Sequence, residues 1–283
     1  MLARRPRPEA LVATDLDRTM IYSRNAFGAA APATVCVEHL DGEPLSYMTT
    51  VAARRLRSLT ESAAVLPTTT RTIKQFTRIR LPGAPWRYAV TSNGGNILVD
   101  GIPDMRWRTD VDAKVRAGGT TLSHVSAELR RRIDDSWVRR FRIADHLFCY
   151  LVVEPAATPP DFLAEWDDWC RSRGWTASQQ GRKIYSMPQA VCKSVAVAEV
   201  RRRLIEAGEL AEGATTLAAG DGALDAEMLL AADRAIRPRH GELEQLGWTA
   251  PNLTVTEAGG IVAGEEILDW LVTESERADR AVA

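Results

Sequence analysis

The sequence predicts an α/β protein, with a doubly wound parallel sheet as its core and a second, smaller α/β domain inserted into the chain. Short apolar segments alternate with segments of helical periodicity in residues 1–101 and again in residues 189–283. This is the pattern of parallel strands joined by crossover helices. Residues 102–188 differ, because they hold helical and strand-like stretches of their own around a proline-rich middle. We therefore expect a core made of residues 1–101 and 189–283, and an inserted domain at 102–188.

The first half of the expected core opens with a buried strand at residues 10–14. This segment is almost wholly apolar and stops abruptly at Asp15, as a strand buried on both faces of a parallel sheet does. The elements expected after it are a β-hairpin with strands at 35–40 and 45–49 and a linker at 41–44, a helix at 50–63, a strand at 63–67, a helix bearing Ile73, Phe76 and Ile79, a third strand at 88–91 and a short strand at 97–99.

The remaining elements are expected from the same spacing rules. In the inserted domain the order is a helix at 122–133, a strand at 138–154, a helix at 161–173 and a strand at 175–187. In the second half of the core the order is a helix at 195–207, a strand at 215–219, a helix at 226–232, strands at 234–236 and 252–256, and a closing helix at 265–272. The last residues, 274–283, are expected to fray.

The composition excludes several classes of protein. A chain of 283 residues with 45% apolar and 26% charged residues can bury one large core or two modest ones. Its net charge of −1 gives no general attraction for nucleic acid or for an anionic membrane. No apolar run approaches the ~20 residues that span a bilayer, so we expect a cytoplasmic protein without membrane or nucleic-acid partners. The arginine-rich stretch at 130–142 is interleaved with acidic residues and is expected to be a solvated face.

The cysteines and histidines suggest no metal site. Neither a zinc site nor a disulfide framework is expected, since the cysteines lie far apart and form no C-x-x-C pair. They are interpreted as small buried hydrophobic residues, and the histidines show no metal-ligand spacing. The residues concerned are Cys36, Cys149, Cys170, Cys192, His39, His124, His146 and His240.

Four of the expected strands end in polar or charged residues. These strand ends are residues 15–19, 68–71, 92–94 and 220–225. In an open parallel sheet, ligands bind beyond the carboxyl ends of the strands. A cluster of aspartates at one place favours a hard divalent cation with oxygen ligands, because uncompensated carboxylates would repel one another. The sequence therefore predicts a Mg²⁺ site at this edge of the sheet.

The pattern Asp15-x-Asp17-x-Thr19 after the first strand resembles the first motif of the haloacid-dehalogenase superfamily of phosphotransferases, and the resemblance covers the whole chain. It implies that Asp15 is the nucleophile that accepts a phosphoryl group and that Asp17 is the general acid and base. Thr19 would complete the loop as a small hydroxyl residue. Thr69 matches the hydroxyl residue of the second motif. Lys193 matches the lysine of the third motif, which neutralises the phosphate and the nucleophile.

The resemblance also implies a set of metal ligands. Asp221 and Asp225 match the acidic pair of the family's Gly-Asp-x-x-x-Asp. The implied Mg²⁺ ligands are thus Asp15, Asp17, Asp221 and Asp225. Of the acidic pair, we expect Asp221 to be the more direct ligand.

Substrate contacts are expected both near the phosphoryl site and away from it. The residues concerned are Thr19, Arg71, Asn93, Arg182 and Lys183, with Asn96 as a further hydrogen-bonding partner. Residues that bind the phosphoryl group serve every substrate alike, so discrimination between leaving groups must come from contacts outside them. We therefore place specificity in the inserted domain, above all at Arg182 and Lys183.

The position of the insertion, between the second and third motifs, resembles the Cof-like branch, which includes sucrose-phosphate and mannosyl-phosphoglycerate phosphatases. The resemblance implies a Rossmann-like core with an α/β cap and a Mg²⁺-dependent phosphatase. Such an enzyme would hydrolyse a small sugar-phosphate-like or nucleotide-like metabolite through an aspartyl-phosphate intermediate. The sequence departs from the family pattern at Arg18, Thr70, Ser194, Gly222 and Leu224. The departures at Arg18, Thr70, Gly222 and Leu224 support the alternative of a non-catalytic metabolite-binding or regulatory protein with the same fold.

Other enzyme classes lack their motifs. Lys193 is not preceded by the glycines of a G-x-x-x-x-G-K-[ST] loop, and the sequence has neither G-x-G-x-x-G after the first strand nor a G-x-S-x-G elbow. Each proposed site residue also has a structural alternative when it is taken alone. Asp221 or Asp225 can cap the following helix, Thr69 can be a turn hydroxyl, and the lysines and Arg182 can be solvated. The ordered set of strand ends favours the catalytic interpretation.

Overall fold

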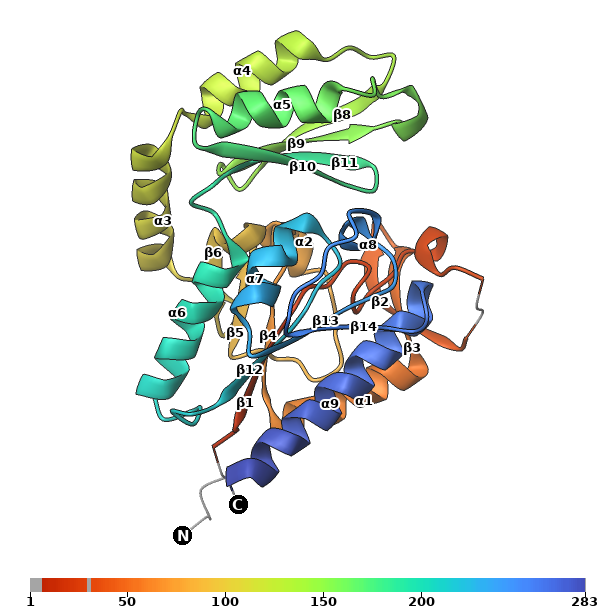
Figure 1. The fold of residues 1–283 in the computed structure, drawn as a ribbon, viewed down its shortest axis with the longest axis vertical. Coiled ribbons are helices and arrows are strands. Elements are labelled where there is room, and N and C mark those ends of the chain that lie inside the picture. The colour runs from red at the N-terminus through yellow and green to blue at the C-terminus, as the bar shows by residue number, and fades with distance from the viewer. Residues whose placement is uncertain (1–6, 30–31, 283) are drawn as a thin grey trace.

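The computed structural model describes residues 7–29 and 32–282, and its centre is a five-stranded parallel sheet (Figure 1). The strand order is β14-β13-β12-β1-β4, and each neighbouring pair is parallel. The strands are β1 (Ala10–Thr14), β4 (Ala64–Pro67), β12 (Thr215–Ala219), β13 (Arg234–Arg237) and β14 (Leu253–Val255). The first strand therefore lies between strands from both halves of the chain.

Helices cover both faces of this sheet. Leu11 and Ala13 of β1 belong to a hydrophobic cluster with α6 (Lys193–Glu206) and α7 (Ala226–Ala231). The alternate residues of β1, Ala10 and Val12, pack in a second cluster with α1 (Thr50–Ser62) and α9 (Ala263–Val282). Because successive side chains of a strand point to opposite faces, this division shows that the sheet is buried on both sides. The predicted doubly wound α/β core is confirmed.

The strand predicted at 88–91 belongs mainly to another sheet and pairs with the parallel sheet only at its end. β5 (Tyr88–Thr91), β6 (Asn96–Val99) and β7 (Ile102–Pro103) form a separate antiparallel sheet. β5 joins β4 only at its end, where Thr68 and Val90 form one parallel bridge. That single bridge still brings the 92–94 loop to the same edge as the other strand ends.

The inserted segment forms a second layer above the core (Figure 1), which we call the cap. Its antiparallel sheet has the order β10-β11-β9-β8. The strands are β8 (Val138–Ala144), β9 (Phe148–Val153), β10 (Trp175–Gln180) and β11 (Lys183–Pro188). Figure 1 shows α4 (Leu122–Arg132) and α5 (Phe162–Arg171) on the far face of this sheet, so that its other face is turned toward the core.

Two cap predictions need correction. The stretches 138–154 and 175–187, each predicted as one strand, are β-hairpins that turn at residues 145–147 and 181–182. A helix that the spacing did not predict, α3 (Met105–Gly118), precedes them. Only Trp107 and Val111 of α3 are buried, so its apolar stripe is too sparse to be recognised in the sequence.

The hairpin after β1 has a tighter turn than predicted. β2 (Thr34–Leu40) and β3 (Glu43–Thr49) are joined by Asp41-Gly42 alone, and both turn residues have positive φ, 53° and 85°. Two-residue hairpin turns favour this left-handed backbone. The other two residues of the predicted linker, Glu43 and Pro44, belong to β3. We call this hairpin the flap.

The C-terminal helix is longer than predicted. α9 continues to Val282, and the prediction that residues 274–283 fray is wrong up to that point. Glu274 and Ser275 are buried, and Glu274 pairs with Arg234 of β13 and with Arg277. Ala283 lies outside the described residues.

The remaining elements are short. α2 (Ile73–Phe76) and α8 (Glu242–Gln245) are single turns, so Ile79 lies outside its predicted helix. The 3-10 turns are Arg24–Ala26, Ser92–Gly94, Pro155–Ala157, Ala223–Asp225 and Gly260–Val262. Two of the cysteines, Cys149 and Cys170, are buried as predicted, whereas Cys36 and Cys192 are half-buried; all four are free. Among the described residues, no helix is both long and apolar enough to cross a bilayer.

Candidate active site

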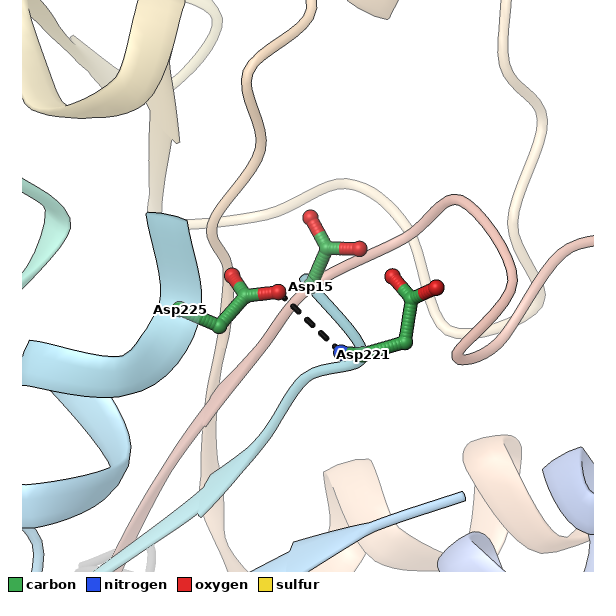
Figure 2. Close-up of side chains that lie close together, drawn as sticks. All are labelled: Asp15, Asp221 and Asp225. Atoms are coloured by element: carbon green, nitrogen blue, oxygen red, sulfur yellow. Dashed lines mark hydrogen bonds between the residues drawn. The ribbon is translucent and has the colours of Figure 1, made fainter. Parts of the chain in front are cut away.

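Three aspartates meet at the carboxyl edge of the parallel sheet (Figure 2). Asp15 follows β1 and Asp221 follows the neighbouring strand β12, while Asp225 stands at the start of α7. One carboxylate oxygen from each lies within 4.8 Å of the others. The three residues are only 3%, 0% and 1% exposed. Sheet topology therefore places side chains more than 200 residues apart in one buried cluster.

Lys193 completes the cluster from the first turn of α6. Its Nζ lies 2.6 Å from Asp15 Oδ1 and 2.6 Å from Asp225 Oδ1, and the residue is 1% exposed. Asp225 is held further by backbone, because its Oδ2 accepts hydrogen bonds from the N–H groups of Asp221 at 3.1 Å and Gly222 at 2.9 Å. Both oxygens of Asp225 thus have partners in this arrangement.

The backbone approaches this cluster closely at two glycines. A Cβ at Gly220 would lie 2.5 Å from the Asp225 carboxyl carbon. A Cβ at Gly241, whose φ is +93°, would lie 2.6 Å from Asp221 Oδ2. Any side chain at either position would displace a carboxylate, so glycine is needed to form the cluster.

Two carboxylate oxygens of the cluster have no hydrogen-bond partner among the described residues. They are Asp15 Oδ2 and Asp221 Oδ2. Asp221 Oδ1 accepts a hydrogen bond from Gln180 Nε2 at 2.9 Å, and Arg18 Nε approaches Asp221 Oδ2 at 3.4 Å. Buried carboxylate oxygens rarely lack a partner. Two such oxygens in one buried cluster of carboxylates fit a hard divalent cation with oxygen ligands.

The charges of the cluster repel one another. Burial raises the pKa of Asp15, and Asp225 adds to this rise, whereas Lys193 lowers it; the result is a pKa of about 7. Burial and the neighbouring Asp15 and Asp225 raise the pKa of Asp221 well above its usual range. Burial alone would lower the pKa of Lys193, but the two carboxylates at its Nζ raise it. A further positive charge bound beside these carboxylates would therefore stabilise their ionised forms.

Asp17 does not join the three aspartates. Its carboxylate accepts two hydrogen bonds from Arg71, from Nε and Nη2, each at 2.7 Å. Burial would raise the pKa of Asp17, but the Arg71 guanidinium holds it at about 2. The structure thus places Asp17, predicted as a metal ligand and as a general acid, in an ion pair in which it is fully ionised.

The flap contributes a carboxylate that the sequence did not single out. Glu38 of β2 is 0% exposed, and its Oε1 pairs with Arg71 Nη1 at 2.8 Å and Arg78 Nη2 at 3.0 Å. Its Oε2 accepts a hydrogen bond from Ser46 Oγ of β3 at 2.6 Å. Arg71 therefore bridges Asp17 of the core and Glu38 of the flap.

The predicted threonines lie at the loops as expected but differ in their contacts. Thr69 is buried and its Oγ1 accepts a hydrogen bond from the Arg71 N–H at 3.1 Å, so it shapes the loop that carries Arg71. Thr19 is 0% exposed, and its Oγ1 has no partner among the described residues.

The two asparagines predicted for substrate contacts are engaged in the fold. Asn93 has a positive φ of 58° and donates from Nδ2 to the carbonyl of Val191 at 2.9 Å. Asn96 donates to Ser92 Oγ at 3.1 Å and to Asp145 Oδ2 at 3.2 Å. Neither side chain lines the cavity described next.

A cavity of about 770 Å³ opens where the core, the flap and the cap meet. Its lining includes Asp17, Arg18 and Arg71 from the core loops, and Gln180, Arg182 and Lys183 from the turn of the cap hairpin. Gln180 also borders a smaller space beside Asp15 and Lys193. The predicted cap residues Arg182 and Lys183 thus face the same cavity as the residues after β1.

His240 positions the loop after β1, a role that its sequence context did not indicate. His240 Nδ1 accepts a hydrogen bond from the Gly260 N–H at 3.1 Å, so Nε2 is the protonated nitrogen and donates to the Arg18 carbonyl at 2.8 Å. Burial lowers the pKa of His240, which favours this neutral form. Arg18 has a φ of 61°, and the His240 contact helps to hold this left-handed backbone.

Comparisons with known proteins identify relatives by structure only. No protein-family model and no curated protein matches the sequence. The sucrose-phosphatase of Synechocystis sp. PCC6803, solved with sucrose and phosphate, is similar with a TM-score of 0.61 at 13% identity, over 94% of this chain and 98% of that one. A trehalose-6-phosphate phosphatase related protein gives 0.54 at 15% identity, over 94% and 99%.

A third similar structure is a sugar phosphatase of haloacid-dehalogenase subclass IIB, with a TM-score of 0.55 at 10% identity, over 94% of this chain and 99% of that one. In all three comparisons the match spans the core and the cap together. The chain therefore has the capped α/β fold of the haloacid-dehalogenase phosphatases, as its strand-end residues and its insertion predict.

Proposed function

We propose that this protein is a Mg²⁺-dependent phosphatase that hydrolyses a small phosphorylated metabolite through an aspartyl-phosphate on Asp15. The observation that carries this proposal is the buried cluster of Asp15, Asp221, Asp225 and Lys193, in which one oxygen of Asp15 and one of Asp221 accept no hydrogen bond among the described residues. A purely structural cluster would use these oxygens in hydrogen bonds. We further propose that residues 102–188 are the cap domain that covers this site.

Asp15 and Lys193 would carry the first half of the reaction. The pKa of Asp15 is raised to about 7 by burial, and a cation bound beside it would favour the ionised form. The ionised carboxylate can attack phosphorus once the charge of the phosphate is screened. The Lys193 ammonium contacts Asp15, so it can orient the nucleophile and neutralise a phosphate oxygen beside it. A divalent cation held by Asp15 and Asp221 would supply further screening of the phosphate charge.

Asp17 would serve as general acid and base, and Arg71 would control when it does. While Arg71 holds both oxygens of Asp17, the carboxylate keeps no proton to give to a leaving group. Substrate phosphate oxygens compete for the same guanidinium, since arginine binds carboxylate and phosphate with similar geometry. We infer that phosphate binding draws Arg71 away and frees Asp17 for proton transfer.

The metal assignment gives a prediction about Asp221 and Asp225. Asp221→Asn removes a buried charge that lacks a full partner, so the Tm of the metal-free protein should rise by a few degrees. The same change should abolish the increase in Tm that Mg²⁺ gives to the unaltered protein. Asp225→Asn is the matched control, and it should lower the metal-free Tm because it breaks the contact with Lys193. Thermal melts across a Mg²⁺ titration measure all three effects. An unchanged Mg²⁺ response in Asp221→Asn would refute Asp221 as a ligand.

The proposed activity is tested with a panel of phosphorylated metabolites and with p-nitrophenyl phosphate. Phosphate release should require Mg²⁺, fall to background after treatment with EDTA, and return when Mg²⁺ is restored. Hydrolysis that EDTA leaves untouched would contradict the metal assignment. Metabolite binding without any hydrolysis would favour the non-catalytic alternative.

A further inference from the structure

The face of the cap sheet that is turned toward the core carries a row of cationic side chains. In the sheet register, Lys183 of β11 lies opposite Val152 of β9, and Val152 lies opposite Arg140 of β8. Directly opposed residues point to the same side of a sheet. Val152 and Lys183 line the cavity above the core, so Arg140 points to the core side as well. Arg182, in the turn before β11, is a second cap cation that lines the cavity.

The neighbouring row and the opposite face confirm this orientation. Arg142 lies opposite Tyr150, and Tyr150 lies opposite Tyr185, so a second arginine points to the core side. The residues between these rows, Leu151 and Ile184, are 0% exposed beneath α4 and α5. The core-facing side of the cap therefore holds Lys183, Arg140 and Arg142.

These cations differ in their partners from four arginines of the cap helices. Arg108, Arg131, Arg132 and Arg171, which lie on the cap helices, form ion pairs with carboxylates of their own helices. Within residues 7–29 and 32–282, no carboxylate lies within 4.0 Å of Lys183, Arg182, Arg140 or Arg142. On the core side of the cavity, Arg71 is already paired with Asp17 and Glu38.

Two cap cations without a carboxylate within 4.0 Å among the described residues, Lys183 and Arg182, therefore line the cavity itself. Lys183 is the most important of them, since it is half-buried and lines the cavity itself. An ammonium group that is partly withdrawn from water is stabilised by an anion. A neutral polyol would leave this charge without an ionic partner, whereas a carboxylate or phosphate would pair with it.

We propose that the substrate is a phosphomonoester whose leaving group carries a second anionic group, a carboxylate or another phosphate, and that Lys183 binds it with Arg182 beside it, while Arg140 adds positive charge from the same face of the cap sheet. This inference rests on the proposed phosphatase function and specifies its substrate class. The transferred phosphoryl group faces Lys193 and the aspartates, and the second anion faces the cap. Adjacent strands lie about 5 Å apart, so Arg140 stands roughly 10 Å from Lys183, two strands away on the same face of the cap sheet.

The test uses phosphate esters with and without a second anion. Glycerol 3-phosphate and 3-phosphoglycerate differ by a hydroxymethyl group against a carboxylate, and fructose 6-phosphate and fructose 1,6-bisphosphate differ by one phosphate. kcat/KM is measured with Mg²⁺ for each. We expect the anionic member of at least one pair to be preferred about tenfold or more. The pair that shows the preference identifies whether a carboxylate or a phosphate is recognised.

Substitutions then assign this preference to the cap. Lys183→Met should lower about tenfold the ratio of kcat/KM for the ester with the second anion to kcat/KM for the ester without it. Arg140→Gln should lower this ratio by a smaller factor. Arg171→Gln is the matched control, because it removes one arginine charge from α5 on the other face of the cap sheet, and it should leave the ratio unchanged. Thermal melts establish that each variant is folded.

The outcomes separate the two proposals. If neither pair is hydrolysed and p-nitrophenyl phosphate is not hydrolysed either, the phosphatase function itself fails. If hydrolysis occurs but neither anionic member is preferred, or if Lys183→Met leaves the preference intact, the phosphatase function stands and the inference of an anionic leaving group is overturned.

Discussion

Asp15→Asn is expected to lower kcat for any phosphomonoester by a factor on the order of 10⁴ or more, because it removes the proposed nucleophile. The amide has nearly the same shape as the carboxylate, but its nitrogen and carbonyl oxygen cannot displace an alkoxide from phosphorus. The loss should appear in kcat rather than in KM, since Asp15 acts on the reacting phosphorus. Steady-state kinetics with p-nitrophenyl phosphate and with the preferred metabolite measure this change.

The fold should survive this substitution. Asp15→Asn weakens the ion pair with Lys193, but it also removes a repulsion from Asp221 and Asp225, and Lys193 keeps its contact with Asp225. Because these effects oppose each other, we expect the Tm of the metal-free variant to stay within a few degrees of that of the unaltered protein. An Asp15→Asn variant that keeps full activity would show that another group is the nucleophile.

Lys193→Met is expected to destabilise the protein by roughly 3–5 kcal/mol, as the loss of one partner from a buried ion pair does. Lys193 is the only residue whose ammonium contacts both Asp15 and Asp225 within the described part of the chain. Without it, two buried carboxylates face each other with no cation between them. Turnover should fall as well, since the same ammonium is proposed to neutralise the phosphate.

A double variant tests whether this cost arises from the ion pair. In Asp15→Asn/Lys193→Met, residue 15 carries no charge, so it no longer repels the carboxylate of Asp225 when Lys193 is absent. The combined loss of stability should therefore be smaller than the sum of the single effects by more than about 1 kcal/mol. Urea unfolding in EDTA gives the free energies of unfolding of the four proteins. Additive effects would mean that Lys193 supports the fold through its packing and not through Asp15.

The site residues that follow strands could be predicted because sheet topology is simple. Once β1 and β12 are recognised as neighbouring parallel strands, Asp15 and Asp221 must lie side by side at one edge. Lys193 begins the helix that packs on β1, so its position follows from the same topology. These placements depend on element order, which hydrophobic periodicity reports well.

Residues whose roles depend on long-range packing could not be predicted. Glu38 occupies an irregular part of β2, where the register shifts on both sides of it, and no local pattern distinguishes this carboxylate from an exposed one. The contacts of Gln180 with Asp221 and of His240 with Arg18 each join segments far apart in sequence. Their roles depend on how the cap and the C-terminal loops pack against the core.

The errors in the elements have local causes. The turn between β8 and β9 contains Asp145 and His146, both with positive φ (45° and 55°), and neither is a glycine or proline, the residues that mark turns most strongly. The polar end of α9 was predicted to fray because Glu274 and Ser275 are hydrophilic, yet both are buried. Tertiary contacts determine both the turn between β8 and β9 and the end of α9, and the pattern of a single sequence does not report these contacts.

The central claim, that Asp15 receives the phosphoryl group, is tested most directly by chemical trapping of the intermediate. An acyl phosphate is reduced by borohydride to an alcohol, so a trapped aspartyl-phosphate becomes homoserine. The protein is mixed with Mg²⁺ and p-nitrophenyl phosphate, quenched with borohydride and digested, and the peptide that contains Asp15 and Asp17 is sequenced by mass spectrometry. We expect homoserine at position 15, only when the phosphate ester is present. Hydrolysis of the ester with both aspartates unmodified, or with the modification at position 17 or elsewhere, would contradict the assignment of Asp15 as the nucleophile.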